Sequence, residues 1–399
     1  DIFFALLRYS LVLSSRAPTR DLPFTEPLSA EQWKQIFALS KKQALMGVIY
    51  SGVQRLPANL QPPKELMDSW SKVVLRIMAA NSLMNGTAAK LTQIFAAHNR
   101  KTIILKGQAN ALLYPDPHVR QAGDIDILVE GGRSSVLKLL KEMGVMEDVG
   151  IDEISNLHVH LNSNKFSSLP LRGEAAPSQN VIPAPEPGPP TRKGVTVEIH
   201  FAPTYNNSPF TTRTMCEFLA QQTSKPGAVK LSDEGFNCPP LTFALVMQLS
   251  HLQRHYFGEG IGLRQLVDYH QLLVHSTAED RALVRDNLRK TGLYHIAGAT
   301  MHVLGAIFKL REDLMICEPD EKRGQQLYEN ILAGGNFGHY SQERKLPTTK
   351  RWLTDRLRPL HRLTFNFSES IWHEFRYIIN FMRYMPKRIK YRKISVRKV

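Results

Sequence analysis

The pattern of apolar and polar residues changes character twice along the chain. Up to about residue 98, apolar residues recur at helical spacing, and Ser29 followed by Gln32 is typical of a capping box. Between residues 101 and 201, short alternating or apolar runs end at glycines, which indicates strands and short helices. From Pro239 onward the helical spacing returns almost without a break. The pattern predicts an α/β or α+β core of about a hundred residues between helical regions.

The expected elements can be named by their sequences. Two stretches should be helical before the core, one opening at Ser29 and one from about Pro63 to His98. The expected strands are "KTIILKG", "DIDILVE", "NLHVHLN" and "VTVEIHF", with helices at "QANALLY" and "SSVLKLLKEMGV". The chain thus divides into an N-terminal helical lead (1–74), a core (75–205), a helical domain (239–385) and a basic tail (386–399).

A proline-rich segment at residues 165–194 interrupts the core. Seven prolines fall between Pro170 and Pro190, so we expect an extended excursion between the last two strands. A long hairpin insertion is the simpler interpretation, and a proline-rich ligand for a partner is the alternative.

Composition places the protein in the globular class. The 399 residues are 43% hydrophobic and 22% charged. The three cysteines are widely spaced without a CxxC pair, which argues against a disulfide framework or a zinc cage and fits a reducing compartment. Apolar runs are too short for a transmembrane segment and no signal peptide is visible, so we expect a cytoplasmic protein.

The positive charge is concentrated at the C-terminus. The formal net charge is +15, and residues 376–399 carry nine basic residues and no acid, which leaves +6 for the rest. Aromatic residues alternate with these basic ones. The segment predicts either a solvated basic helix or a contact with nucleic acid or an anionic lipid surface.

Two aspartates lie inside one of the predicted strands. Asp124 and Asp126 are two residues apart, so their side chains project from the same face, while Ile125 and Ile127 project from the other. Two adjacent buried carboxylates repel each other unless they share a proton or a cation. Mg²⁺ takes carboxylate oxygens together with substrate phosphates, so the pair indicates a metal–phosphate site. An edge-strand turn or a helix cap is the structural alternative.

A third acid can complete such a site. Glu198 stands in the middle of "VTVEIHF", and it joins the aspartates if this strand lies beside "DIDILV". Gly123, just before the first aspartate, leaves room for a close backbone approach.

These motifs resemble the DNA polymerase β-type nucleotidyltransferase superfamily. The run "LKGQANALLYPDPHVRQAGDIDILV" followed by "VEIHF" resembles more closely its bacterial branch labelled an uncharacterised nucleotidyltransferase family. That branch carries an LKG…LYP…R…GDIDLLV signature and a later acid-x-His strand. The segments "LSHLQRHYF", "LRQLVDYHQLL" and "GGNFGH" are similar to its helical half, so the resemblance covers most of residues 30–340.

The resemblance implies an α+β fold, with a nucleotidyltransferase-type mixed sheet and a C-terminal all-α domain. It implies transfer of a nucleoside monophosphate from an NTP to an acceptor hydroxyl, with release of pyrophosphate. Asp124, Asp126 and Glu198 would be the catalytic and metal-binding residues, holding two Mg²⁺ ions, with Mn²⁺ as an alternative. Small molecules, protein hydroxyls and RNA ends are all candidate acceptors.

The chain departs from the superfamily at the phosphate-binding turn. The usual Gly-Ser or Gly-Gly is replaced by Lys106-Gly107-Gln108, so the hydroxyl is absent. Lys106, Gly107 and Arg120 are therefore the predicted nucleotide- and phosphate-binding residues, since ammonium and guanidinium groups bind phosphate. A catalytically inactive module that binds nucleotide or nucleic acid is the alternative function.

Histidines near the predicted site have two interpretations. His158 and His160 share a strand face, and His200 lies on the face of Glu198, so strand pairing brings imidazoles near the acid. His200 and His160 are candidates for supporting the carboxylates, with a purely structural role as the alternative. His251 and His255 lie one helical turn apart but lack the glutamate of an HExxH zinc motif.

Overall fold

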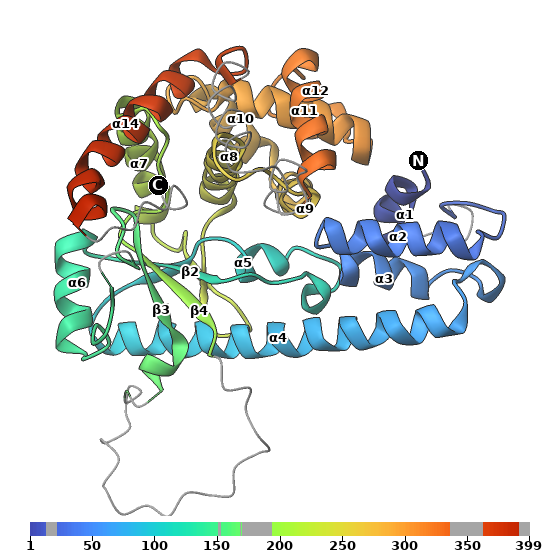
Figure 1. The fold of residues 1–399 in the computed structure, drawn as a ribbon, viewed down its shortest axis with the longest axis horizontal. Helices are drawn as coiled ribbons and strands as arrows, with labels where there is room; N and C mark the ends of the chain where they lie inside the picture. The colour runs from blue at the N-terminus through green and yellow to red at the C-terminus, as the bar shows by residue number, and fades with distance from the viewer. Residues whose placement is uncertain (13–21, 151–152, 168, 170–193, 336–361, 391–399) are drawn as a thin grey trace, which may run out of the picture.

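The structure of the protein is a computed structural model of residues 1–399 (Figure 1). It describes all residues except 13–21, 151–152, 168, 170–193, 336–361 and 391–399. Most of the proline-rich segment, most of "GGNFGH" and the end of the basic tail therefore lie outside the described residues.

The described elements follow the predicted order closely. The helices preceding the core are α1 (Ile2–Ser10), α2 (Ala30–Lys42), α3 (Met46–Gln54) and α4 (Lys64–Ala97). The core contains β1 (Thr102–Ile104), α5 (Gln108–Ala111), β2 (Ile125–Val129), α6 (Gly132–Glu142), β3 (His158–Asn162) and β4 (Thr196–His200). It is followed by α7 (Pro209–Ser224), the small hairpin β5 (Lys230–Leu231) and β6 (Asn237–Cys238), α8 (Leu241–Phe257), α9 (Leu263–His275), α10 (Ala278–Asn287), α11 (Tyr294–Phe308), α12 (Glu321–Gly334) and α14 (Phe367–Lys390). The predicted α+β class is confirmed.

Short 3₁₀ helices fill several connections, at Ala58–Leu60, Pro117–Val119, Ser163–Phe166 and Glu312–Leu314. The stretch that opens at Ser29 has the predicted capping box, but it forms two helices. Ala44 adopts a left-handed conformation with φ of 55°, which ends α2 and turns the chain into α3.

The four-stranded sheet has the order β1-β2-β4-β3. β2 pairs in parallel with β4, and the register places Asp126 opposite Glu198. β3 pairs antiparallel with β4 and places His160 opposite Glu198 and His158 opposite His200. The charged side chains thus share one face of the sheet, because residues two apart on a strand face the same way.

The opposite face of the sheet is apolar. It packs into a hydrophobic cluster with the C-terminal half of α4 and with α6, through Ile125, Ile127, Val129, Val159, Leu161, Val197 and Ile199. α4 runs along one side of the molecule, under the strands at one end and beside α2 and α3 at the other (Figure 1). This apolar face fixes the strand register, since a slip of one residue would turn the carboxylates into the core.

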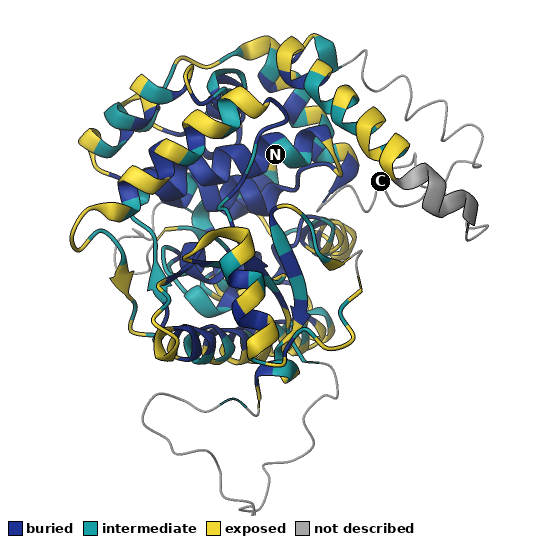
Figure 2. Ribbon diagram, turned by 90° about the vertical axis from the view of Figure 1, so that its left-hand side faces the viewer, coloured by how far each residue is buried: buried dark blue, intermediate teal, exposed yellow. Residues whose placement is uncertain are grey.

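A second, larger cluster joins the N-terminal helices to the helices that follow the core. Helices α1–α3 and the start of α4 contribute to the same core as α7–α12. Buried residues run through the centre of this helical part, and exposed residues cover its outer helices (Figure 2). The N-terminal helices therefore pack with the C-terminal helical domain.

One buried ion pair ties this helical part to the loop before β2. Nε and Nη2 of Arg120 each donate a hydrogen bond of 2.7 Å to a different carboxylate oxygen of Asp268 on α9. The Tyr114 hydroxyl donates to the same carboxylate at 2.6 Å, and the Asn81 amide of α4 donates to the Arg120 carbonyl at 2.8 Å. Asp268 and Arg120 are 2% and 5% exposed, so the pair fixes α9 relative to β2.

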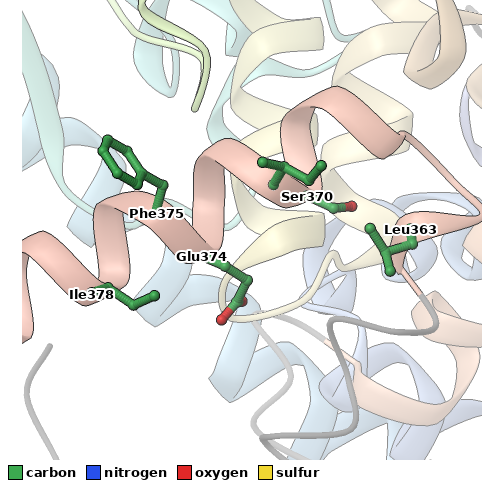
Figure 3. A pocket seen from close by; sticks show the side chains of 6 residues that line it. Leu363, Ser370, Glu374, Phe375 and Ile378 are labelled. Carbon is green, nitrogen blue, oxygen red and sulfur yellow. The ribbon is translucent and has the colours of Figure 1, made fainter.

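The described part of α14 carries exposed apolar side chains, including Phe367, Phe375, Ile378 and Met382. Leu363, Phe375 and Ile378 line a pocket along this helix (Figure 3). None of the helices in the described residues combines the length and apolar character required to cross a membrane.

The turn between β1 and α5 depends on Gly107. Its φ of +63° is costly for a residue with a Cβ atom, although a Cβ there would meet only the Asp124 carbonyl oxygen at 3.6 Å. Gly123 has no positive φ, and a Cβ there would meet nothing within 4 Å.

We therefore expect Gly107→Ala to lower the free energy of unfolding by about 1–2 kcal/mol, through backbone strain alone. Gly123→Ala is the matched control and should change it by less than about 0.5 kcal/mol or raise it slightly. Urea denaturation of the two variants measures the difference. Equal destabilisation by both would contradict the assignment of strain to Gly107.

Candidate functional site

Three carboxylates meet on the polar face of the sheet. Asp124 directly precedes β2, Asp126 lies within it, and Glu198 lies opposite Asp126 on β4. One oxygen from each carboxylate lies within 4.8 Å of the other two. The structure therefore brings the three predicted acids together, and oxygen ligands at this separation suit a divalent cation.

Lys106 provides the positive charge closest to the aspartates. Its Nζ lies 2.9 Å from Oδ2 of Asp126, whose side chain is only 2% exposed. Burial alone would lower the pKa of Lys106, but the charges of Asp126, Asp124 and Glu198 raise it above its usual value. The amine therefore stays charged and offsets part of the repulsion among the carboxylates.

The two aspartates have opposite pKa shifts. The negative charge of Asp126, followed by burial, raises the pKa of Asp124 to about 6. Burial also acts to raise the pKa of Asp126, but Lys106 and His200 outweigh it and hold that pKa below its usual range. Asp124 is thus the carboxylate whose charge has too little compensation, as expected where a cation binds.

Three imidazoles surround Glu198. Nε2 of His200 lies 3.2 Å from Oε2 of Glu198 and also 3.2 Å from Oδ1 of Asp126. Nδ1 of His158 lies 3.4 Å from Oε2 of Glu198, and Nδ1 of His160 lies 3.5 Å from Oε1. The prediction that strand pairing brings these histidines to the acid is confirmed.

The histidines differ in protonation. Burial opposes a charge on His200, but its hydrogen bonds with Asp126 and Glu198 raise its pKa above the usual value. Burial lowers the pKa of His158 to about 4, so this ring is neutral at pH 7. Burial and the negative charge of Asp126 act to raise the pKa of Glu198, yet the hydrogen bond from His200 and the charge of Lys106 outweigh them and lower it, so the carboxylate is ionised.

The opposite wall of the site comes from α8 and α9. Gln248 and His251 on α8, with Arg264 and Gln265 on α9, line a cavity together with Lys106, Gly107, Gly123, Asp124 and Asp126. Burial, followed by the charge of Arg120, lowers the pKa of Arg264 to about 10, which still leaves it charged at neutral pH. The cavity volume is about 30 Å³, room for roughly one water molecule.

Arg120, which was predicted to bind phosphate, forms an ion pair with Asp268. It lines the cavity, but two of its guanidinium nitrogens donate to Asp268. Burial disfavours the charge, but Asp268 raises the pKa of Arg120 above its usual value. The role of Arg120 in binding phosphate stays a prediction, and no local sequence pattern indicates its ion pair with Asp268.

The resemblance implied that the helical domain forms the far wall of the site, but it did not identify Gln248, His251, Arg264 and Gln265 as the residues of that wall. A signal was present, because these polar side chains interrupt otherwise apolar helical faces and are nearly fully buried. Buried polar groups on a helix usually have a partner or line a site.

Gly123 was expected to permit close backbone approach, but no atom lies within 4 Å of its Cβ position, which faces open space.

Comparison with known families identifies the chain at a general level. The model of the family described as "Uncharacterised nucleotidyltransferase" matches residues 29–309, which include β1, β2, β4, α8 and α9. Searches of the curated proteins and of the solved structures gave no match. Because the matched region covers more than half of the chain and contains all the residues of the site, the protein belongs to the uncharacterised nucleotidyltransferase family.

Proposed function

We propose that the protein is a metal-dependent nucleotidyltransferase that moves a nucleoside monophosphate from an NTP to an acceptor hydroxyl. The observation that carries this proposal is the convergence of Asp124, Asp126 and Glu198 on adjacent strands. Membership of a nucleotidyltransferase family supports the same reaction class.

The donor set fits divalent cations. Hard carboxylate oxygens suit Mg²⁺, or Mn²⁺ in its place, and the raised pKa of Asp124 indicates a charge that a cation would compensate. Asp124, Asp126 and Glu198 would hold the ions, two of them in the arrangement that we propose. When bound, such ions neutralise charge on the attacking and leaving oxygens of an in-line displacement.

In the proposed transfer step, Glu198 and two histidines have separate roles. The acceptor oxygen forms a bond to the α-phosphorus, the bond between the α-phosphorus and its bridging oxygen breaks, and pyrophosphate leaves. Glu198, ionised and next to the aspartates, accepts the proton of the acceptor hydroxyl. His200 and His160 orient the Glu198 carboxylate through their contacts with it.

The basic groups around the cavity would bind the triphosphate. Lys106 pairs with Asp126 at 2.9 Å, and we propose that its ammonium moves to the triphosphate once a cation occupies the carboxylates. Gly107 allows the positive φ of the turn that follows Lys106 and leads into α5. Arg264 on the facing wall adds a second positive charge, and Arg120 fixes the position of that wall through Asp268.

Nucleotide entry requires a wider site. A cavity of about 30 Å³ is far smaller than the 300–1,000 Å³ typical of ligand pockets. We propose that Lys106 and other side chains lining the cavity move aside when the NTP binds, while the ion pair between Arg120 and Asp268 keeps α9 in place. The basic segment 376–399 remains a predicted contact for nucleic acid or an anionic surface, and only its first residues are described.

The catalytic role of the carboxylates can be tested at Asp126. Asp126→Asn should reduce transfer of labelled NMP to acceptors in a cell lysate by about 10² or more, because transition-state charge loses its compensation. The matched control is Glu130→Gln, an exposed carboxylate directly after β2, which should keep full activity. Product formation from α-labelled NTPs in Mg²⁺ measures both.

Equal labelling by the wild type, Asp126→Asn and Glu130→Gln would contradict the proposed reaction. Nucleotide binding without any labelled product, unchanged by Asp126→Asn, would favour the inactive binding module.

The raised pKa of Asp124 makes the stability of the protein depend on pH. The folded protein holds the Asp124 proton up to about pH 6, whereas the usual pKa is 3.8. Because the folded state binds this proton more tightly, the contribution of Asp124 to stability is lost as pH rises from about 4 to about 6. Asp124→Asn should therefore be more stable than the wild type by about 1–3 kcal/mol at pH 7 without metal, and nearly equal at pH 4.

Urea denaturation in EDTA at pH 4 and pH 7 measures this difference. Mg²⁺ should raise the melting temperature of the wild type and leave that of Asp124→Asn almost unchanged, because binding to the native state alone is stabilising. A variant less stable than the wild type at pH 7 would contradict the charge repulsion assigned to Asp124.

A further inference from the structure

His158 has no role in the proposed magnesium chemistry, yet it contacts Glu198 together with His200. Nδ1 of His158 and Nε2 of His200 both approach the same carboxylate oxygen, Oε2 of Glu198, at 3.4 Å and 3.2 Å. One ligand atom from each of the three residues lies within 4.8 Å of the other two. Two imidazoles and one carboxylate are a typical ligand set for zinc.

The tautomer of His200 leaves Nε2 directed at acceptors. Nδ1 of His200 lies 3.3 Å from the Ala202 carbonyl oxygen, which can only accept, so Nδ1 carries a hydrogen. Nε2 then faces Oδ1 of Asp126 and Oε2 of Glu198. Only a proton or a metal ion on Nε2 makes this contact favourable. A backbone carbonyl on the second nitrogen is also the usual support of a metal-binding histidine.

The second ring has a buried nitrogen without a hydrogen-bond partner. Nε2 of His158 lies 2.9 Å from Nε2 of His160, so one ring donates to the other. If His160 directs its Nδ1 hydrogen toward Oε1 of Glu198, its Nε2 accepts the hydrogen of His158. Nδ1 of His158 then has no hydrogen, and its lone pair faces Oε2 of Glu198. This atom is buried and makes no hydrogen bond.

The spacing of the ligand atoms agrees with a metal ion between them. Zinc–nitrogen and zinc–oxygen bonds of about 2.0–2.2 Å in a tetrahedral site place neighbouring ligand atoms roughly 3.3–3.6 Å apart. The nitrogen–oxygen distances of 3.4 Å and 3.2 Å are close to this edge length.

We propose that Nδ1 of His158, Nε2 of His200 and Oε2 of Glu198 form a binding site for a transition-metal ion of the zinc class. Imidazole favours such ions over Mg²⁺, which takes oxygen ligands. Three protein ligands leave the fourth tetrahedral position for water or an anion. Glu198 is common to this site and to the carboxylate site, so an ion bound here withdraws Glu198 from the magnesium chemistry. The binding site itself does not depend on the proposed function.

The probe is Co²⁺, which reports tetrahedral coordination by its visible absorption and competes with Zn²⁺ for the same ligands. The full-length wild type should bind one Co²⁺ per chain with a tetrahedral spectrum, and Zn²⁺ should displace it. His158→Gln should weaken binding more than about a hundredfold, because even the loss of an outer partner of a ligand costs 10–100-fold.

Two variants serve as controls. His160→Gln keeps an acceptor for Nε2 of His158 and should bind Co²⁺ within about tenfold of the wild type. Asp124→Asn should keep the Co²⁺ spectrum while losing Mg²⁺ binding, so this site is separated from the carboxylate site. Thermal unfolding of each variant shows whether it is folded.

Wild-type affinity in folded His158→Gln, or loss of the Co²⁺ spectrum in Asp124→Asn, would overturn the proposal. Absence of tetrahedral Co²⁺ in the wild type would also overturn it. Because every readout is metal binding, these results do not depend on whether the protein transfers nucleotides.

Discussion

The repulsion among three carboxylates on adjacent strands is the constraint on which the rest of the site depends. Asp126 is 2% exposed and lies opposite Glu198 in a parallel strand pair, with Asp124 two residues before it. Burying this much negative charge requires positive charge nearby. Lys106 and His200 supply part of it, and the raised pKa of Asp124 shows that they leave the group undercompensated.

The fold holds the carboxylates together by other means than their own interactions. The apolar face of the sheet packs on α4 and α6, so the register of β2 and β4 is set by residues such as Ile127 and Ile199. The ion pair between Arg120 and Asp268 keeps α9 against the loop before β2, and α8 with α9 closes the polar face. Packing energy thus maintains an arrangement that electrostatics alone would separate.

The sequence predicted the parts of the site that follow from local pattern. Alternation within "DIDILV" and "VTVEIHF" gives the common face of Asp124, Asp126 and Glu198, and the sheet confirms that the strands are neighbours. It could not give contacts between distant helices and loops, because Arg120 and Asp268 are 148 residues apart and neither carries a local signal for the other. The particular residues of α8 and α9 that line the facing wall could not be identified for the same reason. The proline-rich segment and most of the basic tail lie outside the described residues.

The most direct test of the account is the position of a metal ion. Crystals of the protein grown with Mn²⁺ and a non-hydrolysable NTP analogue allow the ions to be located by anomalous scattering. We predict anomalous peaks bridging Asp124, Asp126 and the triphosphate, with the ammonium of Lys106 moved from Asp126 onto the phosphates. A nucleotide bound without any ion at these carboxylates, and Lys106 still paired with Asp126, would contradict the central claim.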